Sequence, residues 1–286
     1  MLAKSLALLA LVVPACASMH TEPLLESGYR QMYNLDFDAA HSTFAQHIAQ
    51  HPDDPMGPIS DAAAYLFSEF DRLHILQTEF FLHDQNFSGD RKPTPDRAVT
   101  SLFEQRLNGG LALAHKRLAA DPREANALFA NVLVHGLRSD YEGLIEHRYL
   151  NTLESTKEGR HLAEQLLAID PDYADAWLAI GVENYLLSLK PAPVRWMLQL
   201  AGNATDREYG LEKLRITAEK GAYLRPFAQL LLAVAALREK RRDEARSLLR
   251  PLAAEFPRNR LYADELSRLE PRIEPAANSA TRKQAP

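Results

Sequence analysis

Cysteine is almost absent from the sequence, and its only occurrence, Cys16, excludes both an internal disulfide and a cysteine-based zinc site. Glycine is sparse as well, with 12 residues in a chain of 286, and few glycines among many leucines and alanines favour helix over sheet. There is no basic excess: the formal net charge is −5. Proteins that bind nucleic acid usually carry a basic surface, so we predict no nucleic-acid partner.

The motifs of common active sites are also missing. There is no glycine-rich phosphate loop, no nucleophile elbow, no His-Glu-x-x-His helix and no acidic calcium loop. Carboxylates such as Glu142, Glu146 and Glu183 fall on expected helices, but no two of them are identified as a glycosidase pair. The sequence therefore predicts a protein that is not an enzyme, with no catalytic residue and no cofactor.

Histidine is the remaining residue type that could bind a metal. His47 and His51 are four residues apart and could share a helix face, with His41 further back along the same helix. A metal site needs three or four convergent ligands with supporting partners. A cation at His51, at the helix end before Pro52, also interacts favourably with the helix dipole. We therefore predict no metal site.

The first 17 residues have the pattern of a secretory signal peptide. Lys4 supplies a positive charge, residues 6–13 form an uncharged apolar core, and Pro14 ends it before the small residues 15–17. The apolar core is too short to span a bilayer, which takes about 20 residues. We therefore expect residues 1–17 to be removed and the protein to be exported.

Two processing routes remain open. Cleavage after Ala17 would give a soluble periplasmic or secreted protein without cysteine. Cleavage before Cys16 resembles the maturation of a bacterial lipoprotein, in which that cysteine is lipidated, although Pro14 departs from the usual pattern. In the second case a lipid anchor would be the protein's sole contact with the membrane.

Helical periodicity dominates the chain after Pro23, and four amphipathic segments end in the same way. Each finishes a run rich in Leu and Ala with a proline, namely Pro52, Pro122, Pro171 and Pro257. Two of these junctions, 121–130 and 170–179, share Asp, Pro and three alanines at matching positions. The closing prolines lie 70, 49 and 86 residues apart, so insertions must lengthen the repeats.

These junctions resemble the boundaries of tetratricopeptide repeats (TPR), and the chain is similar to exported bacterial proteins of that family with unassigned function. The family places a small residue twelve positions before the closing proline, and this sequence has Ala40, Gly110, Gly159 and Ala245 there. The first helices carry Gly28, Gly181 and Ala233 at the crossing point, whereas Val132 departs from the pattern. The resemblance implies an all-α, right-handed solenoid of about five TPR-like helix pairs with insertions.

The resemblance also divides the chain. We expect a TPR-like helical domain over residues 18–270, which ends in a helix near 261–269, and a disordered tail over 271–286. Insertions are expected at 83–95 and 190–203, and a further helix pair has Gly210 at its crossing point.

In this family the first helix of each pair lines a concave groove. Applying its inward-facing positions gives a candidate binding site of Asn126, Phe129, Leu133, Asp175, Leu178, Val182 and Tyr185. A groove with apolar walls and a few polar groups suits a helix or an extended peptide. The alternative is that the insertions cover Phe129, Leu178 and Val182, which then belong to the core.

The resulting functional prediction is a non-catalytic scaffold of the bacterial cell envelope that binds a protein or peptide partner of unknown identity. One alternative is an enzyme on a helical solenoid or toroid that acts on an envelope polysaccharide. Such an enzyme would need a deep pocket with two facing acidic groups or a His–carboxylate pair. Another alternative is a structural protein that self-assembles through exposed apolar faces.

Overall fold

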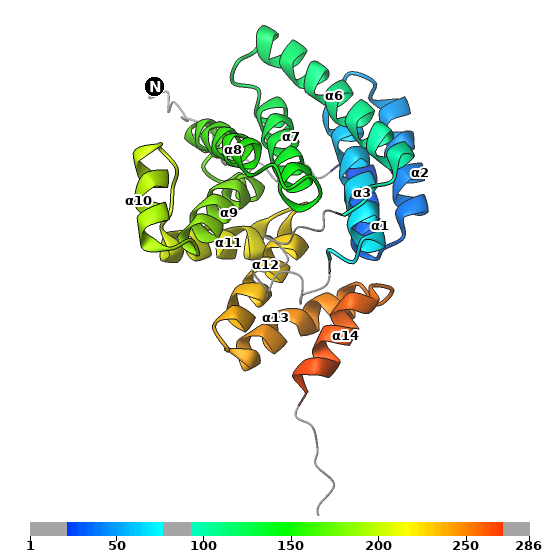
Figure 1. Cartoon of the computed structure of the whole chain (residues 1–286). Coiled ribbons are helices and arrows are strands. Elements are labelled where there is room, and N and C mark those ends of the chain that lie inside the picture. The colour runs from blue at the N-terminus through cyan, green and yellow to red at the C-terminus, as the bar shows by residue number, and fades with distance from the viewer. Residues whose placement is uncertain (1–21, 77–92, 271–286) are drawn as a thin grey trace, which may run out of the picture.

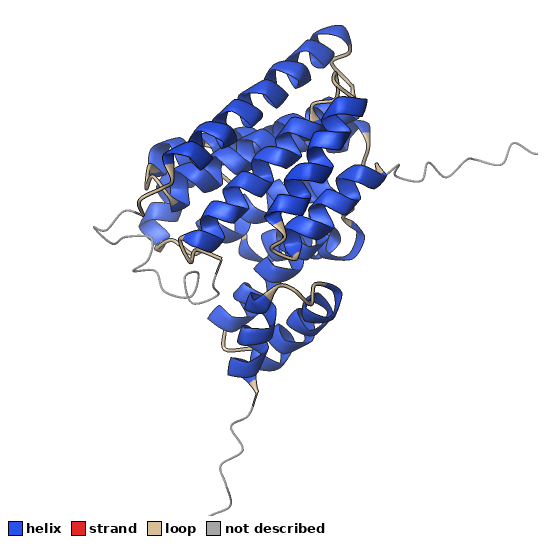
Figure 2. Ribbon diagram, turned by 90° about the vertical axis from the view of Figure 1, so that its right-hand side faces the viewer, coloured by secondary structure: helices blue, strands red, loops and turns tan. Residues whose placement is uncertain are grey.

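The computed structural model of the chain describes residues 22–76 and 93–270. The expected signal peptide with Cys16, the tail 271–286 and most of the insertion 83–95 lie outside the described residues. Within them the protein is all-α, with no strand (Figures 1 and 2). None of the described helices is long and apolar enough to cross a membrane.

The helices pair in chain order, as the repeat pattern predicts. The pairs are α1 (Pro23–Tyr33) with α2 (Phe37–Gln50), α3 (Met56–Arg72) with α6 (Arg97–Ala120), α7 (Ala125–Leu144) with α8 (Tyr149–Ile169), α9 (Trp177–Ser188) with α11 (Arg207–Lys220), and α12 (Arg225–Arg238) with α13 (Arg242–Glu255). A short 3-10 turn, η1 (Ala174–Ala176), precedes α9, and α14 (Arg260–Leu269) ends the array. The expectation of a solenoid of about five helix pairs and a last helix is confirmed.

Each closing proline ends its helix in the same way. Helices α2, α6, α8 and α13 all stop two residues before their proline, and the residue between them leaves the helical conformation. At Asp121, for example, φ is −139° and ψ is 100°. A proline clashes with a helical residue before it and pushes that residue into extended conformation, so these four helix ends follow directly from the sequence.

Small residues lie where paired helices cross, as predicted. A Cβ atom added to Gly28 would strike the ring of Phe44 across the α1–α2 crossing. One added to Gly210 in α11 would lie 2.6 Å from the backbone nitrogen of Tyr185 in α9. At the α7–α8 crossing, Val132 meets Gly159, so the small residue there is on the second helix alone.

The insertion 190–203 forms a helix, α10 (Ala192–Leu200), between the two members of the fourth pair. In Figure 1 it lies at the outer edge of the array, beside α8 and α9. Lys157 Nζ in α8 donates a hydrogen bond to the carbonyl oxygen of Ala201 at 2.8 Å, and Arg160 reaches the carbonyl oxygen of Gly202. Polar contacts therefore hold the end of α10 against the solenoid.

The first helix pair contacts the last elements of the chain. The Asn259 side-chain amide donates to the Tyr33 carbonyl oxygen at 2.9 Å, and Arg258 forms an ion pair with Asp36. Arg260 forms a second ion pair, with Asp71 at the end of α3, at 2.8 Å. Because both ends of the array meet, the surface that would line an open concave groove is enclosed.

Candidate functional site

The structure places most of the predicted groove residues in the core. Four of the seven are buried, namely Phe129, Leu133, Asp175 and Tyr185; Leu178 and Val182 are half-buried, and Asn126 is exposed. The four buried side chains are not accessible to a partner as the structure stands. These four residues therefore belong to the core and do not line an open groove.

Aromatic packing explains why Phe129 is inaccessible. Its ring centroid lies 4.9 Å from that of Tyr173 and 6.5 Å from that of Tyr223, which follows α11. Tyr223 in turn lies 5.1 Å from Tyr29 in α1. Tyr29 from α1 and Tyr223 from the turn after α11 therefore fill the space that an open groove would leave for a peptide, whereas the alternative drawn from the sequence was that the insertions cover it.

Asp175 is a structural anchor. Its carboxylate accepts hydrogen bonds from the backbone N–H groups of Ala222 at 2.9 Å, Tyr223 at 3.1 Å and Leu224 at 3.0 Å. Burial raises the pKa of this carboxyl, and the three N–H groups lower it in part. The bonds hold the turn that carries Tyr223 into the interior, so this acid is fully used by the fold.

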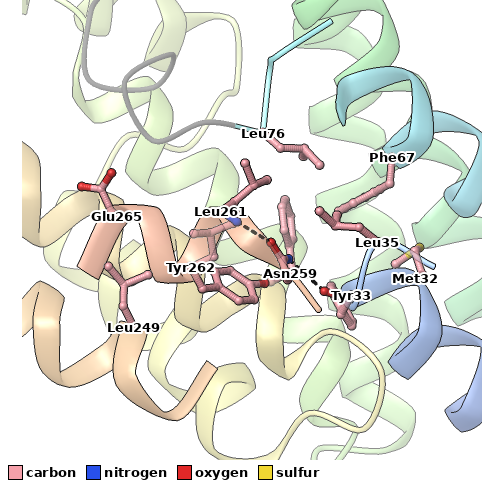
Figure 3. Close-up of a pocket in the computed structure, with 12 residues that line it drawn as sticks. Met32, Tyr33, Leu35, Phe67, Leu76, Leu249, Asn259, Leu261, Tyr262 and Glu265 are labelled. Atoms are coloured by element: carbon pink, nitrogen blue, oxygen red, sulfur yellow. Dashed lines mark hydrogen bonds between the residues drawn. The ribbon is translucent and has the colours of Figure 1, made fainter. Parts of the chain in front are cut away.

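A small apolar pocket lies where the first and last helices meet (Figure 3). Its cavity volume is about 20 Å³, which is room for little more than one water molecule. The polar group at its centre, Asn259, already donates to the Tyr33 carbonyl oxygen and accepts from the Leu261 N–H. The pocket is therefore a packing gap at the closure of the solenoid, too small for a peptide side chain.

A His–carboxylate pair occurs between α2 and α3. His41 Nδ1 lies 2.5 Å from Asp61 Oδ1, and Arg106 Nε in α6 lies 2.7 Å from Asp61 Oδ2. Asp61 is buried, and both of its oxygens link neighbouring helices. Neither His41 nor Asp61 lines the pocket of Figure 3, so the pair is part of the structural network between three helices.

Leu150 in α8 is the most exposed single apolar side chain that the structure describes, at 82%, but the largest group of exposed apolar side chains on one helix is on α10. No residue of α10 is buried, and three of its large apolar side chains are mostly exposed: Trp196 is 62% exposed, Met197 64% and Leu200 69%, whereas Leu198 is half-buried. We call these three side chains, with Val194, the α10 surface. Exposed apolar patches of this kind usually mark interaction sites, and Trp and Met are enriched at protein interfaces.

The edge of the α10 surface is basic. Residues 184–205 contain no Asp or Glu, whereas Lys190 is exposed and Arg195 carries a second positive charge. The Arg195 guanidinium donates to the carbonyl oxygens of Ser188 and Lys190, which ties the start of α10 to the end of α9. The helix is thus tied at both ends by polar contacts while its apolar side chains stay uncovered.

The α10 surface was not predicted from the sequence, because residues 190–203 were interpreted only as an insertion. The signal was present: Val194, Trp196, Met197 and Leu200 follow two prolines in a segment that the repeat pattern does not need. An apolar helix outside the repeat has no partner within it.

Comparison with known proteins adds little. No family of known proteins is matched, and no curated protein is similar. Among solved structures, a thermophilic TPR protein of Thermus thermophilus is similar at 16% identity and a TM-score of 0.45, over 86% of this chain and 96% of that one. That likeness is too low to carry an argument, so the functional proposal depends on the surface itself.

Proposed function

We propose that this protein is a non-catalytic scaffold that binds another protein through the α10 surface. The observation that carries the proposal is the exposure of Trp196, Met197 and Leu200 on a helix with no buried residue. Leaving large apolar side chains in water forgoes about 1.5–3 kcal/mol each relative to burial. A partner that covers them recovers that free energy.

The partner we propose is a protein segment with apolar side chains flanked by acidic residues. Its apolar side chains would pack on Trp196 and Met197, and its carboxylates would face Lys190 and Arg195. We place this interaction in the bacterial cell envelope, in the periplasm or at a membrane held by a lipid on Cys16. The signal-peptide pattern of residues 1–17 supports that location.

The test compares two variants of the full chain in pull-downs from envelope extracts of its own host. Trp196→Ser with Met197→Ser removes the centre of the α10 surface, and Leu102→Ser removes an exposed leucine from α6 as a matched control. We expect one specific protein to be lost with the first variant and kept with the second. Titration of that purified protein should show an affinity at least tenfold weaker for the α10 variant.

Three outcomes would contradict the proposal. If the recovered proteins are the same for both variants, the binding surface lies elsewhere. If the α10 variant loses binding to anionic vesicles and no protein, the surface binds lipid. If light scattering shows that the unmodified chain is an oligomer and the α10 variant a monomer, the surface joins copies of this chain.

The alternative function is an enzyme on a helical toroid that acts on an envelope polysaccharide. The one feature of it that the described residues contain is a His–carboxylate pair, His41 and Asp61, 2.5 Å apart, although both Asp61 oxygens are already used between helices. Hydrolysis of a panel of envelope glycans, lost on Asp61→Asn in a variant that keeps its helical circular dichroism, would establish this function in place of the first.

A further inference from the structure

Three potential metal ligands meet where α1 begins and α2 ends. Glu22 immediately precedes α1, His47 is in the last turn of α2, and His51 follows that helix. One ligand atom from each lies within 4.8 Å of the other two. The sequence shows only the two histidines as neighbours, and the fold adds the carboxylate from another helix.

His47 has the environment of a preorganised ligand. Its side chain is fully buried, and its Nε2 lies 2.9 Å from Asp54 Oδ2. If Nε2 donates its proton to that carboxylate, Nδ1 is left with a free lone pair. Nδ1 is buried, and no hydrogen-bond partner for it exists among the described residues. Metal-binding histidines are typically held this way, with a carboxylate on the second nitrogen.

The supporting carboxylate is itself fixed. Asp54 Oδ1 accepts a hydrogen bond at 3.0 Å from the backbone N–H of Met56, at the start of α3. The Cδ2–Nε2 edge of the His47 ring faces the same helix, because Cδ2 lies 2.9 Å from where a Cβ of Gly57 would be. Nδ1 is on the opposite side of the ring and therefore faces away from α3.

The other two ligands are free to adjust. The His51 ring centroid lies 4.8 Å from that of His47, and His51 is exposed. The backbone N–H of Glu22 donates to the hydroxyl of Tyr223 at 3.3 Å, which holds the main chain of Glu22 but does not engage its carboxylate. Over residues 22–76 and 93–270, no hydrogen bond or ion pair engages the Glu22 carboxylate or the His51 imidazole.

We propose that Glu22, His47 and His51 bind one divalent transition-metal ion of the zinc class. Two imidazole nitrogens and one carboxylate oxygen suit zinc, whereas calcium and magnesium prefer all-oxygen sites. A tetrahedral ion with bonds of about 2.1 Å holds its ligand atoms about 3.4 Å apart. The side chains of Glu22 and His51 must therefore approach His47 by at most about 1.4 Å, which rotation about their own bonds provides.

Three protein ligands leave one position for water or for a group from a partner. The bound ion would tie the residue that precedes α1 to the end of α2. This site is separate from the α10 surface, so it does not rest on the proposed function.

The test is calorimetric titration of Zn²⁺ into the full chain after removal of metals with a chelator. We expect one Zn²⁺ per chain, and X-ray absorption should show two imidazole ligands. Glu22→Gln and His51→Ala should each weaken binding at least tenfold. Asp54→Asn should weaken it 10- to 100-fold, because that residue orients His47. His115→Ala, which removes an exposed histidine on α6, is the matched control and should bind as the unmodified chain does.

Two results would overturn the proposal. One is the absence of one-to-one binding in the unmodified chain. The other is unchanged affinity in both Glu22→Gln and His51→Ala, which would place the ion elsewhere on the chain. Both substitutions change accessible side chains that make no hydrogen bond or ion pair among the described residues, so we expect the helical circular dichroism to be kept in each variant.

Discussion

Replacing Asp175 by alanine should destabilise the protein strongly, because three backbone N–H groups depend on this carboxylate. A buried donor left without a partner costs about 1–3 kcal/mol. Ala222 is half-buried, so water can reach its N–H, whereas Tyr223 and Leu224 are buried. The N–H groups of Tyr223 and Leu224 would therefore have neither the carboxylate nor water as a partner, at a cost of about 2–6 kcal/mol.

Removal of the carboxylate also removes the free-energy cost of burying its charge. Burial raises the pKa of Asp175 and so disfavours its charged form. This relief offsets part of the loss, and we expect a net destabilisation of about 3 kcal/mol. For a domain of this size that lowers Tm by about 6–12 °C.

The assay is thermal and denaturant unfolding followed by circular dichroism at neutral pH. Asp172→Ala is the matched control, because that aspartate is exposed one turn earlier and should change stability by less than about 0.5 kcal/mol. Asp175→Asn should fall between the two, since one oxygen remains to accept hydrogen bonds. A loss below about 1 kcal/mol for Asp175→Ala would refute the assignment of this carboxylate as the anchor of the α11–α12 turn.

Four further substitutions test the packing and the electrostatics of the fold. Gly210→Ala should destabilise by about 2 kcal/mol or more, because its Cβ would lie 2.6 Å from the backbone nitrogen of Tyr185. Gly109→Ala, in α6 with open space around its Cβ, should stabilise by about 0.5–1 kcal/mol in the same unfolding assay. Burial raises the pKa of Asp140 to about 7, so its contribution to stability is full below the ordinary pKa of 3.8 and is lost as pH rises toward 7. The full shift corresponds to about 4 kcal/mol, but Asp140 is half-exposed and solvent screens its charge, so Asp140→Asn should stabilise the protein above pH 7 by about 2 kcal/mol and much less at pH 4; a pH-independent effect would contradict this. Phe129→Ala should cost about 3–5 kcal/mol, measured by urea unfolding, and a variant of normal stability that loses a partner would restore the groove interpretation.

The helices were predictable from the sequence because their signals are local. A proline two residues after a helix end fixes that end through its clash with the preceding residue, as at Pro122 and Pro171. A glycine at the expected position predicts a close crossing, as for Gly181 with Gly210. The closing proline and the crossing glycine each act within a single repeat. They can therefore be recognised even where the rest of the repeat pattern is degenerate.

The binding site was less predictable because it depends on contacts between distant segments. The inward positions of α7 and α9 would line a groove in an open array. Here Tyr223 enters that space and lies against Tyr29, far away in the sequence. No short-range pattern shows that the turn before α12 will be held inward by Asp175. The same limit applies to Glu22, which meets His47 only once α1 has packed on α2.

Closure of the array changes where a partner can bind. In an open solenoid the first helices present their inner side chains to a ligand. In this chain Asn259 and Arg258 join the last elements to the first pair, and the inner side chains stabilise the fold. The surfaces left for a partner are then the outside of the array and its insertions. The insertion between α9 and α11 carries the apolar surface on which we place the partner, with Trp196 and Met197 exposed on a helix that the repeat itself does not require.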